Sequence, residues 1–391
     1  MNAADGSTDG MTFSRTIFAG IKVCAGLALL LAAMPRPAAQ DEPSRFHVNV
    51  VLVQLSIAVT DNKGNYVTGL RPEDFTVLED NIPQKISSFD DGNQPSSPPV
   101  DTAQSGDSTT PPGTPLGTPP GTPPGTVKAD RAPSGANGTE MTHTLAGVTL
   151  PGLTGASVFI LFDTSNYMYR GFVYAQDAIT DFIRTMPDAS KIAFYSYSRD
   201  LSRGSSLTAD RFRVVNGVRS TVAGDDAALY NSLLLTVKDA APLRGRKAIV
   251  VFSNGPDNAS SVPPEDVAEL AQSTGTIIYI VSTRQAETEP ISSAAFERMS
   301  RATGGKAYFA RNWRQEKDAF ASIKDDLSHL YTISYYPQMN PNRGWRGIKV
   351  QLMGKNLEKY HIRTRDGYNL QKQSEINTDN DSALVTEPEP K

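Results

Sequence analysis

The segment "SVFILFDTSNY", Ser157–Tyr167, joins a run of apolar residues directly to a run of polar ones. A short apolar run bounded by turn-forming residues is typical of a strand that is buried on both faces of a sheet. The polar residues from Asp163 to Asn166 would then follow the carboxyl end of this strand. Open α/β sheets bind their ligands at that edge. The segment therefore predicts a buried strand and a candidate site beside it.

Apolar segments of strand length alternate with segments of helical periodicity between residues 153 and 330. In "RGFVYAQDAITDFIRTM", Phe172, Ile179 and Phe182 share one helical face. The predicted strands are 157–163, 190–198, 246–254, 275–282 and 304–310, and the predicted helices are 170–186, 225–241, 263–274, 292–303 and 315–331. This alternation predicts an α/β fold with a doubly wound, mostly parallel sheet and helices on both faces.

The two ends of this region carry β patterns instead. Residues 44–91 contain "VNVVLVQLSIAVTD", with alternating β-branched residues, and residues 331–370 contain "YTISYYP", "RGIKVQLMG" and "YHIRTRDGY". A β module of residues 44–91 is too small to form a sufficient core alone. We therefore expect the N-terminal and C-terminal strands to combine into one smaller accessory β domain.

The N-terminus has the pattern of a secretory signal peptide over residues 1–40. Arg15 and Lys22 precede "VCAGLALLLAAM", and small residues follow in "PRPAAQ". An uncleaved membrane anchor is the alternative, but Lys22 leaves the apolar run short of the roughly 20 residues that span a bilayer. The sequence thus predicts an exported protein, periplasmic, cell-surface or secreted, with no membrane span after cleavage. Cys24, the only cysteine, lies in this leader, so the exported chain would have no disulfide, which suits a bacterial envelope.

Residues 92–152 are rich in proline, glycine and threonine, as in "PPGTPLGTPPGTPPGT", and predict a disordered linker. Residues 371–391 predict a disordered tail. The formal net charge is −4 and the pI is near 5.7, with no basic run, so nucleic acid is not an expected partner.

Oxygen-bearing side chains lie at three predicted loops. Asp163 and Ser165 lie at the end of the first strand, Asp225 and Asp226 precede a helix, and Asn254 and Asp257 lie after "AIVVFS". Because Mg²⁺ prefers such oxygen ligands, these loops could form a metal site. Helix capping and turn formation are the alternative roles for the same residue types.

Residues 156–330 resemble a von Willebrand factor type A domain. "FILFDTSNYM" stands where that family has a strand leading to Asp-x-Ser-x-Ser, and "GDDAALYNSL" stands where it has a Gly-Gly-Thr-x-Leu-Tyr-like loop. "KAIVVFSNGPDN" stands where the family has a strand ending in Thr/Ser-Asp-Gly-x-Asp. The flanking "GLRPEDFTVLEDNIPQKISSF", "YTISYYP" and "RTRDGY" resemble VWFA-related proteins of acidobacterial type.

The resemblance implies a metal-ion-dependent adhesion site, in which Asp163 and Ser165 match the first two ligands. Tyr167 stands at the second serine position, Ala227 at the threonine position, and Asn254 replaces an aspartate. Each change removes a ligand or a charge on which divalent-cation affinity depends. We therefore expect a degenerate site, with Mg²⁺ as the one cofactor it could take, and Asp225 or Asp226 as a substitute carboxylate.

Enzyme motifs are missing from the sequence. Ser165 stands where Asp-x-Asp phosphatases have their second acid, and there is no Gly-x-Ser-x-Gly, Walker loop or His-Glu-x-x-His. The four histidines show no ligand spacing. The chain is therefore expected not to be an enzyme.

The sequence predicts instead an interaction protein that contacts a protein or cell surface. Its binding face would be the loops that follow the parallel strands, termed here the top face, with Tyr167, Asp225, Asp226 and Asp257 on it. We expect Tyr169 and Tyr174 around the same face, together with Tyr195 and Tyr197 beyond the second strand, as binding aromatics or as half-buried packing residues. The alternative function is a structural or assembly protein of the bacterial envelope with a relic metal site.

Overall fold

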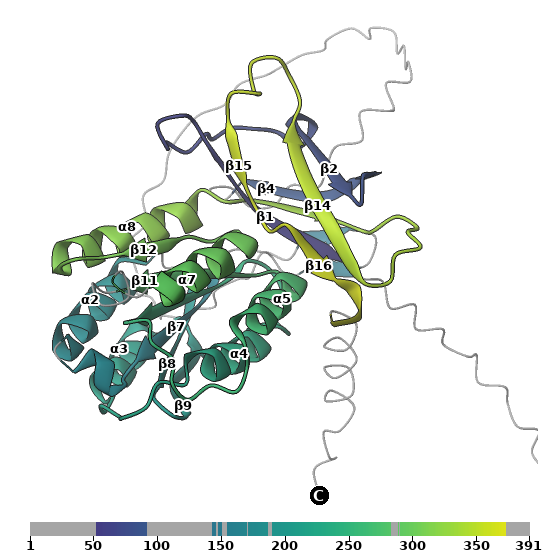
Figure 1. Ribbon diagram of the computed structural model, residues 1–391. Helices are drawn as coiled ribbons and strands as arrows, with labels where there is room; N and C mark the ends of the chain where they lie inside the picture. The colour runs from purple at the N-terminus through teal and green to yellow at the C-terminus, as the bar shows by residue number, and fades with distance from the viewer. Residues whose placement is uncertain are drawn as a thin grey trace, which may run out of the picture. The chain divides into compact units, whose positions relative to one another are not determined.

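The computed structural model describes residues 52–91, 143–145, 148–150, 155–169, 171–186, 190–282, 288 and 290–372 (Figure 1). The predicted signal peptide and most of the predicted linker and tail lie outside these residues. Two short strands, β5 (His143–Leu145) and β6 (Val148–Leu150), pair antiparallel within the segment predicted as linker.

Six strands form the main sheet, in the order β12-β11-β10-β7-β8-β9. Their bounds are β7 Ser157–Asp163, β8 Lys191–Tyr197, β9 Leu201–Thr208, β10 Lys247–Ser253, β11 Thr276–Ser282 and β12 Ala307–Phe309. All neighbouring strands are parallel except β8 and β9, which are antiparallel. The prediction of a doubly wound, mostly parallel α/β sheet is therefore confirmed.

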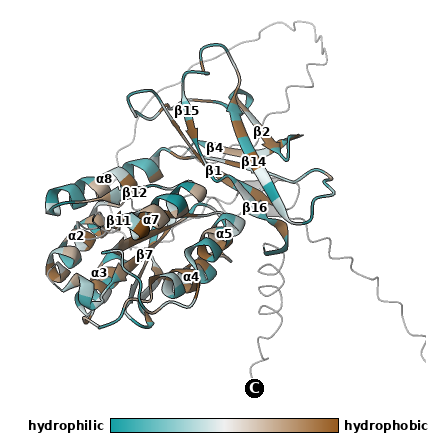
Figure 2. Cartoon of the chain, viewed as in Figure 1, coloured by the Kyte–Doolittle hydropathy of each residue, from teal (hydrophilic) through white to brown (hydrophobic). Residues whose placement is uncertain are grey.

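Helices cover both faces of this sheet. The elements α2 (Phe172–Thr185), α3 (Arg211–Arg219) and α8 (Trp313–Ser328) share one apolar core with alternate residues of β7, such as Ile160 and Phe162. On the other face α4 (Leu229–Ala240), α5 (Pro264–Thr274) and α7 (Pro290–Ala302) pack with Phe159 and Leu161. Both faces of β7 are thus buried, which explains its continuous apolar sequence, shown in the hydrophobic colour in Figure 2.

The strand β9 and the helix α3 were not predicted from the sequence. β9 reads "LSRGSSLT", and half of its residues are exposed because it is an edge strand. Helix α3 lies close against it because two glycines meet there: a Cβ at Gly217 would lie 2.9 Å from the carbonyl oxygen of Gly204. β9 and α3 pack partly through this backbone contact instead of through apolar side chains. Their sequences therefore show little of the apolar periodicity from which a strand or helix is predicted.

The strands from the two ends of the chain form two four-stranded antiparallel sheets, β15-β1-β13-β4 and β16-β14-β2-β3. Their bounds are β1 Val53–Thr60, β2 Phe75–Glu79, β3 Ile82–Gln84, β4 Ile86–Asp91, β13 Tyr331–Tyr335, β14 Trp345–Leu352, β15 His361–Arg363 and β16 Gly367–Asn369. Leu55, Val77 and Ile333 belong to one core between them. The predicted accessory β domain, built from both ends of the chain, is confirmed.

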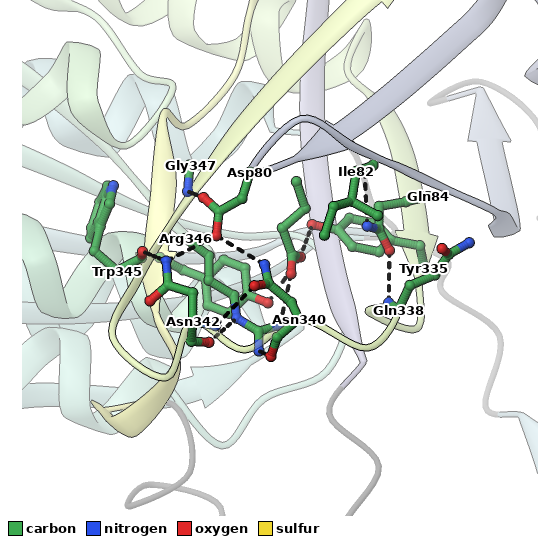
Figure 3. Close-up of polar contacts among 12 residues, drawn as sticks. Asp80, Ile82, Gln84, Tyr335, Gln338, Asn340, Asn342, Trp345, Arg346 and Gly347 are labelled. Atoms are coloured by element: carbon green, nitrogen blue, oxygen red, sulfur yellow. Dashed lines mark hydrogen bonds and ion pairs between the residues drawn. The ribbon is translucent and has the colours of Figure 1, made fainter.

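A tight turn between β2 and β3 is held by the loop before β14 (Figure 3). Asp80 and Asn81 have positive φ angles of 48° and 66°. The Asp80 carboxylate accepts hydrogen bonds from Gly347 N at 2.8 Å and from the side-chain amides of Asn340 and Asn342 at 2.9 Å. Partial burial opposes ionisation of Asp80, but these donors keep its pKa below the ordinary value. They also offset the cost of a left-handed turn at non-glycine residues.

Candidate functional site

Asp163 ends β7 at the point where the strand order turns from β8 on one side to β10 on the other. The carboxylate is fully buried, and its two oxygens accept hydrogen bonds from Ser165 N and Ser253 Oγ, each at 2.9 Å. Burial raises the pKa of Asp163, while the hydrogen bonds from Ser165 and Ser253 act against the rise. The carboxylate is thus held at the topological switch point of the sheet, where α/β folds bind ligands.

Ser165 lies directly after this strand and precedes the short helix η2 (Asn166–Met168). Its side chain is 1% exposed, and its Oγ makes no hydrogen bond of ordinary geometry with the described residues, although it lies near enough to Asp163 to act against the rise of that pKa. A buried hydroxyl without a partner costs free energy, so an unexplained one points to a missing ligand or water. Ser165 is the residue of this loop that best suits a metal or another ligand.

Asn254 and Tyr167 close the other side of the loop. The side-chain amide of Asn254, which follows β10, donates a hydrogen bond to the backbone carbonyl of Tyr167. Asn254 is 4% exposed, and Tyr167 is half-buried. The Asn254 amide carries no negative charge. Its hydrogen bond joins the loop after β10 directly to the loop after β7.

The remaining acidic residues of the predicted site have separate partners. Asp226 accepts two hydrogen bonds from the Arg199 guanidinium, at 2.6 and 3.0 Å. Asp257 accepts from the backbone amides of Tyr230 and Ser260, at 3.0 and 2.9 Å, and so caps the start of α4. Asp257 therefore has the helix-capping role, which is the alternative to metal binding predicted for this residue type.

Asp225 is exposed at the same edge of the sheet. Its backbone carbonyl accepts a hydrogen bond from Asn166 N at 2.9 Å, which joins the loop after β7 to the loop before α4. All seven residues singled out from the sequence therefore lie in loops of the top face. Their side chains do not converge on one point.

The tyrosines divide into two groups. Tyr169 and Tyr174 are 69% and 68% exposed, whereas Tyr195 and Tyr197 are buried within β8. The expectation that Tyr195 and Tyr197 lie beyond the strand end was wrong, because their rings pack in the core under α4. Tyr197 donates a hydrogen bond to Ser253 Oγ at 3.0 Å and so supports the Asp163 contacts from below.

An apolar cavity of about 210 Å³ lies next to the exposed tyrosines. It is lined by Met168, Gly171, Tyr174, Phe252, Trp313 and Glu316, among others. Trp313, at the first position of α8, is 54% exposed and was not singled out from the sequence. The signal that could have found it is a tryptophan placed directly after a helix-capping asparagine, where packing does not require an aromatic ring.

Residues 157–322 match the von Willebrand factor type A domain model. This part of the chain is a von Willebrand factor type A domain. No curated protein matches the chain. Domains of this type bind proteins. None of the helices in the described ranges has the length and apolar character needed to span a membrane.

Several solved structures resemble the chain at low identity. The conserved hypothetical protein BatB from Bacteroides thetaiotaomicron has a TM-score of 0.39 and 16% identity, over 44% of this chain and 98% of that one. A von Willebrand factor type A protein from Catenulispora acidiphila has a TM-score of 0.39 and 14% identity, over 56% and 66%. The corresponding domain of the type V pili tip protein Mfa5 from Porphyromonas gingivalis has a TM-score of 0.37 and 12% identity, over 44% and 94%.

The residues of this von Willebrand factor type A domain do not fit a divalent cation. Ser165 Oγ could serve as a metal ligand, but both oxygens of the adjacent Asp163 carboxylate already accept hydrogen bonds. Asn254 presents an amide to Tyr167, and Asp226 is paired with Arg199. In the described part of the chain no three His, Cys, Asp or Glu side chains are grouped as metal ligands. Mg²⁺ binding depends on ligand number and charge, and both are low here.

Restoring the missing ligands is expected to create a metal site. The triple variant Tyr167→Ser, Ala227→Thr, Asn254→Asp should show saturable Mg²⁺ binding in a calorimetric titration, whereas the natural chain should show none at millimolar metal. At a Mg²⁺ concentration of about 100 times Kd, binding would add about 2.7 kcal/mol to the free energy of unfolding of the triple variant. Adding Asp163→Ala to the triple variant is the control and should abolish binding. Saturable binding by the natural chain would show that the site is intact.

Proposed function

We propose that the top face binds a protein partner by direct contact, without a bridging metal ion. The observation that carries this proposal is the hydrogen bond from the Asn254 amide to the Tyr167 carbonyl. It connects two loops of the top face through the protein's own atoms and places a neutral group where a metal site would need a carboxylate. Without a metal ion, a binding face at this edge would have to contact its partner through its side chains alone.

The aromatic residues beside the loop would supply the contact area. Tyr169, Tyr174 and Trp313 are each more than half exposed, and the last two line the apolar cavity. Large, rigid aromatic side chains bury much area at little cost in conformational entropy and dominate the energetics of many interfaces. An apolar side chain of the partner that enters this cavity would be removed from water on most sides.

The predicted signal peptide would place this interaction outside the cytoplasm, in the bacterial envelope or at its surface. A role in adhesion and a role in envelope assembly both require a bound protein, and they differ in which face of the chain holds it. An assembly role with a relic site would use surfaces other than the top face. The accessory β domain offers one such surface around the exposed Tyr336.

Capture of envelope proteins on the immobilised chain tests the proposal. We expect at least one protein to be captured equally with and without EDTA, and the double variant Tyr174→Ala, Trp313→Ala to lose about 90% or more of it, since truncating two interface aromatics costs over 1.4 kcal/mol. Tyr336→Ala is the matched control and should capture normally. Release by EDTA would contradict a metal-free interface. Capture that depends on Tyr336 and not on the double variant would favour the assembly role.

A further inference from the structure

A second, polar cavity of about 260 Å³ lies between the β8–β9 hairpin and the end of α3. It reaches the top face through Thr164, which also lines it. The other polar side chains along its wall are hydroxyls and one carboxylate: Ser196, Ser198, Asp200, Ser202, Ser220 and Thr221. No lysine, arginine or histidine lines it. The polar side chains of the wall thus present oxygen atoms and no cationic group.

Backbone contacts fix the wall of this polar cavity. Gly224 donates a hydrogen bond to the carbonyl of Thr164 at 2.7 Å, and Ala228 donates to the carbonyl of Ser198 at 2.8 Å. A Cβ at Gly224 would lie 2.4 Å from Ser198 Oγ, so only glycine permits this approach. The cavity is therefore formed before any ligand arrives, and it is tied to the Asp163 loop through Thr164. Pre-formed sites lose less entropy on binding.

Ser196 shows that the hydroxyls of the wall do not all find hydrogen-bond partners within the part of the protein that the structure describes. It is 7% exposed, it lines the cavity, and it lies opposite Ser202 in the antiparallel pair β8–β9. Among the described residues no hydrogen bond is made by the hydroxyl of either serine. The Ser196 side chain is almost fully buried, and a buried hydroxyl normally has a partner. Ser202 is exposed on the edge strand, so its hydroxyl already faces solvent. Both hydroxyls are available to a group that enters the cavity, and Ser196 is the one that burial makes unusual.

The charge around the cavity favours a cation. Asp200 is the one carboxylate on the wall, and it has no ion pair within the described ranges. Three arginines near the cavity are paired elsewhere: Arg199 with Asp226 at 2.6 Å, Arg203 with Asp239 at 2.6 Å, and Arg219 with Asp177 at 2.7 Å. The cavity also adjoins the carboxyl end of α3, whose dipole is negative there. An anion could accept hydrogen bonds from the hydroxyls, but the Asp200 carboxylate and the carboxyl end of α3 would repel it.

We propose that the polar cavity binds the side-chain ammonium of a lysine of the partner protein. An ammonium donates three hydrogen bonds and accepts none, which matches the Asp200 carboxylate and the free hydroxyls of Ser196 and Ser202. This assignment rests on the proposed function, since the cavity opens beside the same top face, and it makes the partner basic at the contact. The resemblance to metal-dependent domains would instead imply an acidic group of the partner, held through the ion.

The test uses two small probes with the full chain: Nα-acetyl-lysine methylamide, and Nα-acetyl-norleucine methylamide, which lacks only the ammonium. Nuclear magnetic resonance titration should give saturable millimolar binding of the lysine probe, with shifts at Ser196 and Ser202, and none for the norleucine probe. Asp200→Asn should weaken lysine binding about tenfold or more, because a charge-assisted hydrogen bond is lost. Ser196→Ala should weaken it several-fold, and Asp318→Asn, an exposed acid of α8, should not change it.

Equal binding of the two probes, or unchanged lysine binding by Asp200→Asn, would overturn the proposal. Methylamine binding as tightly as the lysine probe would also overturn it, in favour of a site for small amines. The outcome is separable from that of the proposed function. EDTA-independent capture that survives Asp200→Asn keeps the top-face interaction and rejects the lysine contact. Lysine binding in a chain that captures no protein rejects the interaction and keeps the cavity as an ammonium site.

Discussion

Replacing Asp326 with alanine is expected to lower the free energy of unfolding by about 3–5 kcal/mol, because it removes one partner of a buried ion pair. Asp326, in α8, is fully buried and accepts hydrogen bonds from Tyr66 Oη at 2.6 Å, from Tyr279 and from Arg363. Lys306 Nζ lies 3.7 Å away. Alanine would leave a guanidinium and two hydroxyls without their acceptor.

The effect of Asp326 is also expected to depend on pH. Burial opposes its ionisation, but Arg363, Lys306 and the tyrosine hydroxyls more than compensate, so the pKa lies below the ordinary value of 3.8. A carboxyl group whose pKa is lower in the folded state stabilises the protein above the unfolded pKa. This contribution should be present above about pH 3.8 and be lost as the pH falls through the folded-state pKa. Urea unfolding at several pH values measures it.

Two variants make the Asp326 result interpretable. Asp325→Ala removes the neighbouring, exposed acid, which pairs with His329 at 3.2 Å, and should cost no more than about 1 kcal/mol. Asp326→Asn keeps an acceptor oxygen but removes the charge. Its free energy of unfolding should therefore fall by an amount between those for Asp325→Ala and Asp326→Ala. A loss below about 1 kcal/mol for Asp326→Ala would show that the ion pair is not needed for stability.

The main sheet was predictable because burial on both faces requires apolar residues throughout a strand. β7, β10 and β11 meet this condition, with each residue of β10 and β11 buried. The pairing of the terminal strands followed from a size argument, since neither end has enough residues for a core of its own. The edge strand β9 escaped prediction because an edge with one covered face tolerates a polar sequence.

The loops of the candidate site were predictable for a related reason. Parallel strands end at one edge, so Asp163 and Asn254 had to lie near each other. The partner of each side chain was not predictable. Arg199 and Asp226 lie in different loops, and Tyr66 and Asp326 are 260 residues apart. Such pairs depend on the final geometry of the backbone, and hydrophobic periodicity carries no signal for them.

Glu79→Ala is expected to destabilise the accessory β domain by about 3–5 kcal/mol, again because a buried ion pair loses one partner. Glu79 ends β2 and is fully buried. Its carboxylate accepts hydrogen bonds from Arg346 Nη1 at 2.7 Å and from the hydroxyls of Tyr335 and Tyr368 at 2.8 and 3.0 Å. Figure 3 labels Arg346 and Tyr335, which come from β14 and β13, one strand from each of the two sheets.

Hydrogen exchange locates the effect of Glu79→Ala. Protection should fall first in β13 and β14, which carry Tyr335 and Arg346, because local opening exposes the strands that have lost a partner. Glu73→Ala is the matched control: its pair with Arg71 is exposed and 3.8 Å long, and it should leave both strands protected. Glu79→Gln retains an acceptor oxygen, so its loss of protection should lie between those of Glu73→Ala and Glu79→Ala. Equal loss of protection in β7 and β10 would mean that the two β sheets and the α/β domain unfold as one unit, and that Glu79 stabilises the whole chain.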